Sequence, residues 1–284
     1  MIQIKSLDSI KFESLFSVFK EAFSDYEMQV NEKELQVMLG RRGFEPSLSY
    51  GLFVDDELKS FILNGIGNFY GEKTAYDTGT GTLKEYRGKG YASKIFRYSL
   101  PFLKEAGVSQ YLLEVLQHNT NAVSVYKKLG FEVSREFNYF IQDSSQVQIP
   151  ARVLPSGYEI REVSCMELDN VDCYGDFNPS WQNSIDAVMR RVEDFRFFAA
   201  LYLDKLVGYC IFEPSSGDVS QIAVAETHRR KGIASALLTE ALKANRHNNI
   251  KIVNTDIACT NITGFLSYCG IQLKGKQFEM VKKW

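Results

Sequence analysis

Residues 87–93 read RGKGYAS, and residues 229–235 read RRKGIAS. The two stretches share Arg, Lys, Gly, Ala and Ser at equivalent positions and lie 142 residues apart (229 − 87), which is half of the 284-residue chain. Similarity at a fixed spacing indicates an internal repeat. The sequence therefore predicts two similar domains in tandem.

A polar stretch at residues 142–146 separates the copies, and Pro155-Ser156-Gly157 closes the segment that follows it. Such composition is typical of a linker. We place the boundary near residue 145 and expect an N-terminal domain over residues 1–144 and a C-terminal domain over residues 145–284. A chain of 284 residues that is 45% hydrophobic has room for two ordinary cores.

Hydrophobic spacing predicts the order β-α-α-β-β-β-α-β-α-β in the first copy. The expected helices are 9–23, 32–41, 88–106 and 120–129, and the expected strands are 2–5, 50–54, 58–69, 74–83, 111–116 and 131–141. The second copy repeats the later part, with strands at 197–203, 206–212, 218–224 and 250–256 and a helix at 230–245. This order predicts an α/β fold in which each domain has a mixed, mainly antiparallel sheet with helices on both faces.

The stretch Arg87-x-x-Gly90-x-Ala92 follows an expected strand and opens an expected helix. The first backbone N–H groups of a helix and its dipole favour a bound anion, and glycine lets such a group approach closely. An ordinary strand-to-helix turn with solvated basic residues is the alternative. The occurrence of the stretch at equivalent places in both copies favours a phosphate site.

At this point the sequence resembles the GNAT N-acetyltransferase superfamily, whose acetyl-CoA signature is Arg/Gln-x-x-Gly-x-Gly/Ala after the fourth strand. A second signature appears as Asn119-x-x-Ala122-x-x-x-Tyr126-x-x-x-Gly130-Phe131. The resemblance implies acetyl-CoA as co-substrate and no metal. The cofactor-binding residues that it implies in the first copy are Thr82, Leu83, Arg87, Gly88, Lys89, Gly90, Tyr91, Ala92 and Asn119.

The resemblance assigns catalytic roles to Tyr126 and Glu114. In this family the tyrosine protonates the departing thiolate, which with a pKa of about 8.5 is a mediocre leaving group near neutral pH. Glu114-Val115 resembles the Leu-Glu-Val of the ribosomal-protein alanine N-acetyltransferases, in which the glutamate is the general base through water. A core aromatic and a solvent-facing carboxylate are the alternatives for these two residues.

The strand before the turn contains the run Thr78-Gly79-Thr80-Gly81-Thr82, which is unusually rich in glycine for a strand interior. Such a run indicates a β-bulge or the close approach of a ligand. The resemblance implies that backbone N–H groups near Thr82 and Leu83 hold the acetyl carbonyl.

The second copy departs from the family pattern. Leu266 stands four residues before Gly270, where the first copy has Tyr126 before Gly130, although Asp256 keeps a carboxylate at the place of Glu114. Its expected cofactor contacts are Val224, Arg229, Arg230, Lys231, Gly232, Ile233 and Ala234. The sequence leaves open a second slower active site, cofactor binding, substrate shaping or a structural role.

Charge and composition argue against other classes of protein. A formal net charge of −2 provides no basic field for nucleic acid. The N-terminus lacks the layout of a signal peptide and no apolar run is long enough to span a bilayer, so we expect a soluble cytoplasmic protein without a membrane partner. The five cysteines form no CxxC pair and the three histidines are far apart, which disfavours a metal site.

Two hypotheses remain for the function. The first is an enzyme that transfers acetyl from acetyl-CoA to a primary amine of a small molecule or peptide by direct attack, since no Ser-His-Asp or Cys-His arrangement indicates an acyl-enzyme. The second is a non-catalytic acyl-CoA-binding sensor or scaffold with the same fold. The sequence does not identify the amine and leaves a monomer or a homodimer open.

Overall fold

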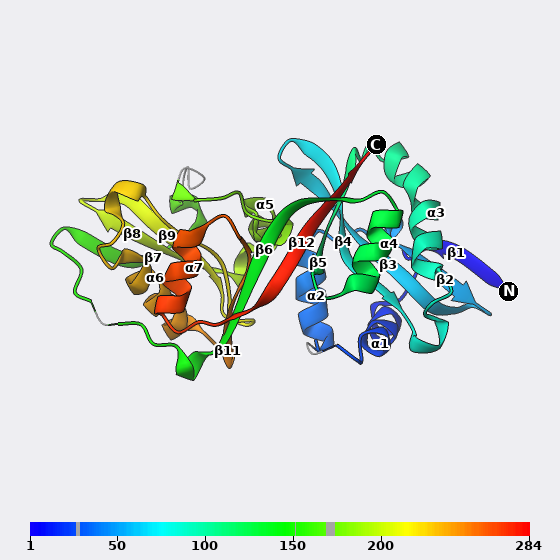
Figure 1. Ribbon diagram of the computed structural model, residues 1–284, viewed down its shortest axis with the longest axis horizontal. Coiled ribbons are helices and arrows are strands. Elements are labelled where there is room, and N and C mark those ends of the chain that lie inside the picture. Colours follow the sequence, from blue (N-terminus) through cyan, green and yellow to red (C-terminus); the bar gives the residue numbers. More distant parts are fainter. Residues whose placement is uncertain (27–28, 151, 169–173) are drawn as a thin grey trace. The chain divides into compact units, whose positions relative to one another are not determined.

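The computed structural model describes residues 1–26, 29–150, 152–168 and 174–284 (Figure 1). The chain forms two compact units: unit 1 is Met1–Ser134 with Glu279–Trp284, and unit 2 is Arg135–Phe278. This division differs from the expected domains 1–144 and 145–284. The strand β6 (Glu132–Asp143) continues from unit 1 into unit 2, and the last strand, β12 (Leu273–Lys283), returns to unit 1.

Unit 1 has a mixed sheet in the order β1-β2-β3-β4-β5. Its first four strands pair antiparallel, whereas β4 and β5 pair parallel. Its elements are β1 (Ile2–Ser6), α1 (Phe12–Ala22), α2 (Glu32–Arg41), β2 (Tyr50–Val54), β3 (Glu57–Phe69), β4 (Glu72–Thr82), α3 (Tyr91–Glu105), β5 (Gln110–Leu116) and α4 (Thr120–Lys128). The expected mixed α/β fold and the expected order of elements are confirmed.

Helices cover both faces of the unit 1 sheet. On one face, Leu15 of α1 and Leu35 of α2 join a core with Phe61 and Leu63 of β3. On the other face, α3 packs along β2, β3 and β4, and its Phe96 lies edge-on to Tyr111 of β5 with ring centroids 5.2 Å apart. The alternation of side chains along each strand produces the two apolar layers.

Unit 2 has its strands in the order β6-β11-β10-β9-β8-β7, with β10 and β11 parallel. Its further elements are β7 (Tyr158–Val163), α5 (Ile185–Met189), β8 (Arg196–Tyr202), β9 (Lys205–Glu213), β10 (Asp218–Val224), α6 (Ile233–Ala244), β11 (Asn249–Asp256) and α7 (Thr260–Tyr268). Of these, β7, α5 and α7, together with β12, go beyond the elements expected from the sequence. One core lies against α6 and α7 and another against α5, so this sheet also carries helices on both faces.

The helix expected to start at residue 88 begins instead at Tyr91. Gly88 and Gly90 have positive φ angles of 76° and 71°, a left-handed conformation that cannot continue a right-handed helix. In the second copy α6 begins at Ile233 for the same reason, since Arg230 and Gly232 have φ angles of 65° and 88°. Each helix therefore begins directly after a left-handed glycine, and another left-handed residue stands two positions before that glycine.

The described residues contain neither a metal-binding cluster nor a membrane-spanning helix. No group of three or more His, Cys, Asp or Glu side chains there is arranged to hold a metal ion. No helix in this part of the chain is long and apolar enough to cross a membrane. Cys165, Cys210, Cys259 and Cys269 are free thiols, and Cys173 lies outside the described residues.

Candidate active site

The N-terminus of α3 is open. Gly90 is the N-cap residue, and no side chain caps the first turn. An added Cβ at Gly88 or Gly90 would meet no atom of the described residues within 4 Å. The first N–H groups of a helix without a side-chain cap, together with the positive end of the dipole, form a site for an anion.

Arg87 holds this turn in place through its side chain. Its guanidinium donates to both carboxylate oxygens of Asp25 at 2.5 and 2.9 Å and to the Ala22 carbonyl oxygen at 2.8 Å, and its Nε donates to the Thr82 carbonyl oxygen at 3.2 Å. The hydrogen bond from Arg87 lowers the pKa of Asp25 from 3.8 to about 2. The side chain thus joins the end of α1 to the end of β4, and residues 88–90 of the turn are exposed.

The parallel pairing beside this turn is short. Thr74–Tyr76 of β4 pair with Gln110–Leu112 of β5, and the pairing ends there although β4 continues to Thr82 and β5 to Leu116. The Leu83 N–H donates to the Lys59 carbonyl oxygen, which makes Ser60 and Thr82 a non-hydrogen-bonded pair. The Thr82 N–H therefore points away from β3, toward the side of β5 where the pairing has ended.

This geometry separates the two backbone donors expected from the sequence. The Thr82 N–H faces the unpaired edge of β4, where a ligand can accept from it. The Leu83 N–H is already used by Lys59, and the Leu83 side chain is buried in the core with α1. This pairing disfavours a contact between the Leu83 N–H and the acetyl group, which stays a prediction, because antiparallel pairing turns alternate N–H groups to opposite sides of a strand.

A β-bulge lies in the glycine-rich run. Leu63 pairs with Gly79 and Asn64 with Asp77, so Thr78 is the extra residue of β4. The bulge places Tyr76 and Asp77 against the two expected catalytic residues. The Tyr76 hydroxyl donates to Glu114, and the Tyr126 hydroxyl donates to Asp77 at 2.9 Å.

Tyr126 and Glu114 reach this point from opposite faces of the sheet. The Tyr126 ring lies edge-on to Phe131, which contacts Phe96 of α3. Glu114 stands three residues after Tyr111, whose ring faces α3, so its side chain points to the other face. A thioester at the unpaired edge of β4 would have a phenol on one side and a carboxylate on the other.

Asn119 is the N-cap residue of α4. Its side-chain oxygen accepts from the Ala122 N–H at 3.2 Å, which leaves a contact with the cofactor to the amide nitrogen. Lys89 and Tyr91, the remaining expected contacts in the turn, differ in exposure. The Lys89 ammonium is exposed and lies 4.7 Å from the centre of the Tyr86 ring, whereas Tyr91 is buried.

Three contacts of this site were missed by the sequence analysis. Asp77 directly precedes the neutral run of Thr and Gly at residues 78–82, and its charge was the available signal in the sequence. Arg42, which follows α2, donates to the Thr78 carbonyl oxygen at 3.3 Å and lies over the Tyr76 ring. Nothing in the local sequence around Arg42 indicates that position. Tyr76 is joined to Glu114 only through the parallel pairing of β4 and β5.

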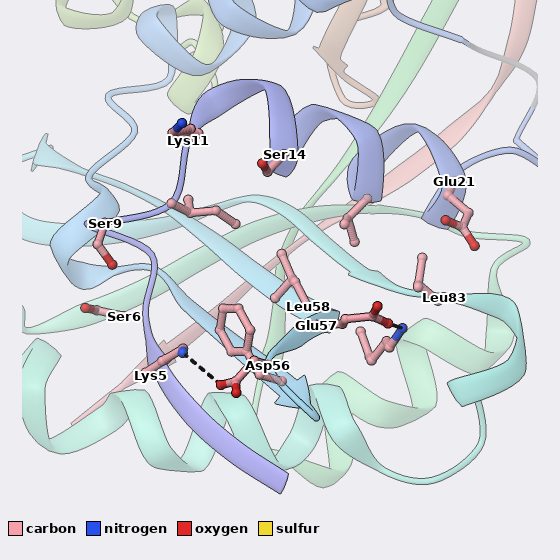
Figure 2. A pocket seen from close by; sticks show the side chains of 14 residues that line it. Lys5, Ser6, Ser9, Lys11, Ser14, Glu21, Asp56, Glu57, Leu58 and Leu83 are labelled. Carbon is pink, nitrogen blue, oxygen red and sulfur yellow. Dashed lines mark hydrogen bonds and ion pairs between the residues drawn. The ribbon is translucent and has the colours of Figure 1, made fainter. Parts of the chain in front are cut away.

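A shallow cavity of about 560 Å³ lies elsewhere in unit 1, beneath α1 and beside the hairpin of β2 and β3 (Figure 2). Of the expected site residues, Leu83 lines it, and Tyr126 and Glu114 are not among its described lining residues. Four of its charged side chains form ion pairs, Lys5 with Asp56 and Lys59 with Glu57. It is separate from the cluster around Tyr126.

The equivalent turn of unit 2 has the same clamp. Arg229 Nε donates to the Val224 carbonyl oxygen at 2.9 Å, and its Nη2 donates to Asp176 at 2.7 Å. The Lys231 ammonium donates to the Tyr158 hydroxyl at 2.8 Å. Ile233 is buried and Ala234 packs against the core of the unit.

Unlike the turn of unit 1, this turn is covered by its own chain. A Cβ at Gly232 would meet Arg152 Cβ at 3.3 Å and Leu154 Cδ2 at 3.9 Å. The Arg152 guanidinium donates to the Tyr268 hydroxyl at 3.2 Å, and the Gln148 N–H donates to the Cys269 carbonyl oxygen at 3.0 Å. Residues 147–150 and 152–154 thus run over the end of α7 and the start of α6.

Comparisons with known proteins agree with these features. The model of the acetyltransferase (GNAT) family matches residues 12–131 and 162–263. N-alpha-acetyltransferase 30 of Schizosaccharomyces pombe is 38% identical over 60 residues, which are 21% of this chain and 40% of that protein. The uncharacterized N-acetyltransferase YobR of Bacillus subtilis is 36% identical over 59 residues, which are 21% of this chain and 24% of that protein.

Solved structures match over the full length. A tandem GNAT protein from the clavulanic acid biosynthesis pathway has a TM-score of 0.76 at 11% identity, covering 100% of this chain and 98% of that one. A GCN5-related N-acetyltransferase from Sphaerobacter thermophilus has a TM-score of 0.74 at 14% identity, covering 99% and 95%. These likenesses show the fold, while the sequence alignments cover less than half of either curated relative. With the family model matched in both halves, the chain belongs to the acetyltransferase (GNAT) family.

Proposed function

We propose that this protein transfers the acetyl group of acetyl-CoA to a primary amine of a small molecule or peptide, and that the reaction takes place in unit 1. The observation that carries the proposal is the open start of α3 beside the unpaired edge of β4, with Tyr126 and Glu114 on either side of that edge. The residues fit the cofactor, since backbone donors and a helix dipole face outward where a diphosphate would bind.

Named groups of unit 1 would hold acetyl-CoA. The N–H groups of residues 88–92 and the Lys89 ammonium suit the diphosphate, the Thr82 N–H suits the pantetheine arm or the acetyl carbonyl, and the Asn119 amide lies at the start of α4. When bound, acetyl-CoA supplies an activated acetyl group. Every other part of the reaction falls to side chains of this chain.

Tyr126 and Glu114 have complementary tasks. Burial raises the pKa of Tyr126 well above its ordinary value of 10.0, so the phenol is protonated at neutral pH and can donate to the leaving sulfur. Glu114 accepts the proton that the amine loses, with the Tyr76 hydroxyl fixing its carboxylate. The amine attacks the thioester directly.

Unit 2 is proposed to be a divergent, non-catalytic copy. Leu266, which stands where unit 1 has Tyr126, is fully buried and has no proton to donate. Arg152 and Leu154 lie next to Gly232 at its helix start, at the position where we propose that unit 1 binds the diphosphate. In this proposal the residues expected to contact a cofactor, Val224 and residues 229–234, stabilise the turn, and the covering segment keeps a cofactor out.

Calorimetry with acetyl-CoA tests both parts of this proposal. We expect one molecule bound per chain, and loss of binding in Lys89→Glu, which places a negative charge in the turn without touching Arg87 or Asp25. Lys104→Glu, which changes an exposed charge at the other end of α3, is the matched control. Binding of two molecules per chain would contradict the assignment of unit 2, and no binding would contradict the function.

A screen of amines then identifies the substrate. Free CoA is measured with peptide N-termini, polyamines, aminoglycosides and amino acids as acceptors. Turnover with any of these supports the transferase. Binding of acetyl-CoA without turnover across all four classes would favour a sensor or scaffold.

A further inference from the structure

Asp77 lies directly behind the hydroxyl of Tyr126. Its Oδ2 accepts from the Tyr126 hydroxyl at 2.9 Å and from the Thr80 hydroxyl at 2.7 Å, and its Oδ1 accepts from the Gly79 N–H at 3.0 Å. Both oxygens are thus held by the bulge and by α4. A carboxyl group with this many partners has a fixed orientation toward the phenol.

The second copy keeps the bulge and loses the pair. The extra residue of β10 is Ser220, at the position that Thr78 has in unit 1. Val219 takes the place of Asp77, and Leu266 takes the place of Tyr126. The carboxylate beside the bulge of unit 2 is Asp218, which accepts from the Ser220 hydroxyl at 3.0 Å. At the positions of Asp77 and Tyr126, the pair of carboxylate and phenol is therefore present in unit 1 and replaced by Val219 and Leu266 in unit 2.

The phenol of Tyr126 is by itself a weak acid for protonating a thiolate. The thiol of CoA has a pKa of about 8.5, and the ordinary phenol of tyrosine has a pKa of about 10. Burial raises the pKa of Tyr126 further, and an ionised Asp77 would add to this increase, whereas a protonated Asp77 would not. Proton transfer from this phenol to a thiolate is therefore unfavourable, unless the phenol receives another proton as it gives up its own.

Resting on the proposed function, we propose that Asp77 is the positioning residue of Tyr126 and passes it a proton as Tyr126 protonates the leaving sulfur. A carboxylic acid is a stronger acid than a thiol, so transfer from Asp77 through the phenol to sulfur is downhill overall. The hydrogen bond at 2.9 Å provides the path between the two groups.

Bonds and protons are conserved in the proposed reaction. The N–C bond forms and the C–S bond breaks, and the proton of the amine moves to Glu114. Tyr126 gives its proton to sulfur and takes the proton of Asp77. Solvent then restores both carboxyl groups, one by losing and one by gaining a proton, so the products are the amide and the free thiol.

The groups around Asp77 act on its ionisation in opposite directions. Burial raises the pKa of Asp77, whereas the hydrogen bonds from Thr80, Tyr126 and the Gly79 N–H, and the charge of Arg42, lower it. Tyr76 and Tyr111 are the other titratable groups whose ionisation is coupled to that of Asp77, from β4 and β5. Acetyl-CoA bound at this edge would exclude water, and this exclusion would further favour the protonated carboxyl.

The kinetic test compares Asp77→Asn, Tyr126→Phe and the double variant. Asparagine keeps the shape and an accepting oxygen but has no proton to pass on. We expect kcat to fall about 100-fold in Asp77→Asn, at the low end of general-acid contributions, with the KM for acetyl-CoA unchanged. The double variant should be no slower than Tyr126→Phe, because residues that act as one unit are not additive.

The pH profile separates this role from a structural one. In the wild type kcat falls at high pH as the Asp77 and Tyr126 pair loses its proton. That limb should be absent in Asp77→Asn and should move to higher pH in Thr80→Val, since the Thr80 hydroxyl stabilises the ionised carboxylate. If the fall of kcat at high pH is unchanged in Asp77→Asn, the proposal is overturned. It is also overturned if this fall moves to lower pH, because that shift would mean that an ionised Asp77 merely keeps Tyr126 protonated.

A binding measurement without turnover provides an independent readout. Calorimetry of acetyl-CoA binding in buffers of different ionisation enthalpy counts the protons taken up. We expect uptake in the wild type and less in Asp77→Asn, at equal affinity. Equal uptake in both would overturn the role of Asp77, whereas absence of binding in the wild type would instead refute the proposed function.

Discussion

The two turns at residues 87–93 and 229–235 have nearly the same conformation and opposite surroundings. In both, an arginine binds the carbonyl oxygen five residues before it and an aspartate from a distant segment, and a left-handed glycine precedes the helix. One turn faces open space, and the other lies beneath Arg152 and Leu154. A shared motif therefore fixes the path of the backbone, but it does not fix whether a ligand can reach it.

The largest expected effect distinguishes the two units at the helix that carries the second signature, α4 in unit 1. Tyr126→Phe should lower kcat by about 10²- to 10⁴-fold, the range of general-acid catalysis, and leave acetyl-CoA affinity unchanged. Tyr268→Phe, on the matching helix of unit 2, should leave kcat unchanged. Steady-state kinetics and calorimetry on the same preparations check both. Equal losses in the two variants would place the chemistry outside unit 1.

A second effect concerns the open turn itself. Gly90→Val forces a β-branched residue into a left-handed conformation, at a cost of roughly 1–2 kcal/mol, and puts a side chain where the diphosphate would approach. We expect acetyl-CoA affinity to fall by about tenfold or more. Gly71→Val, in an equally open left-handed turn between β3 and β4, carries similar strain and should bind normally. If Gly71→Val also binds acetyl-CoA more weakly, the loss of affinity in Gly90→Val comes from a less stable unit 1.

A smaller effect is expected from the segment that covers the turn of unit 2. Leu154 packs against the core of unit 2, so Leu154→Ala should lower the free energy of unfolding by about 1–2 kcal/mol, less than a fully buried leucine. Urea denaturation measures the change. The kcat with acetyl-CoA should stay the same, because the residue lies in unit 2. A fall in kcat at unchanged stability would show that the covering segment contributes to the reaction.

The smallest effect concerns the arginine clamp that both turns share. The pKa of Asp25 is depressed to about 2, so the pair with Arg87 stabilises unit 1 above pH 3.8 and loses this contribution as the pH falls toward 2. Asp25→Asn should therefore lower the Tm slightly at pH 7 and weaken its dependence on pH between 4 and 2. The pair is exposed, so the change is small. A Tm that depends on pH as steeply as in the wild type would locate the acid sensitivity elsewhere.

Local patterns predicted most of the fold, and long-range pairing explains the rest. The helices and strands of unit 1 were predicted from hydrophobic spacing because each is amphipathic or buried over its own length. The return of β12 to unit 1 depends on contacts between residues more than 100 apart, such as Trp284 with Val108. No local signal marks such a strand.

The residues of the candidate site also divide between those that local motifs mark and those that long-range packing brings in. Arg87, Gly90, Glu114 and Tyr126 belong to spaced motifs, whereas Asp77 acquires its position only from the bulge at Thr78 and from α4. The cover on Gly232 likewise comes from residues 152–154, which the sequence marks only as linker. Motifs identify the residues that a ligand can use, and packing decides which neighbours join or block them.

The last strand also has a consequence for how the chain folds. The Trp284 indole N–H donates to the Val108 carbonyl oxygen at 2.7 Å, and Ser134 binds Glu279. Unit 1 therefore receives its final strand only after nearly all of unit 2 has been synthesised. Pairing over so long a separation is slow, since closing a large loop costs entropy before any contact is gained. A gene fragment cut at the linker would encode a first half without the residues Glu279–Trp284 that complete unit 1.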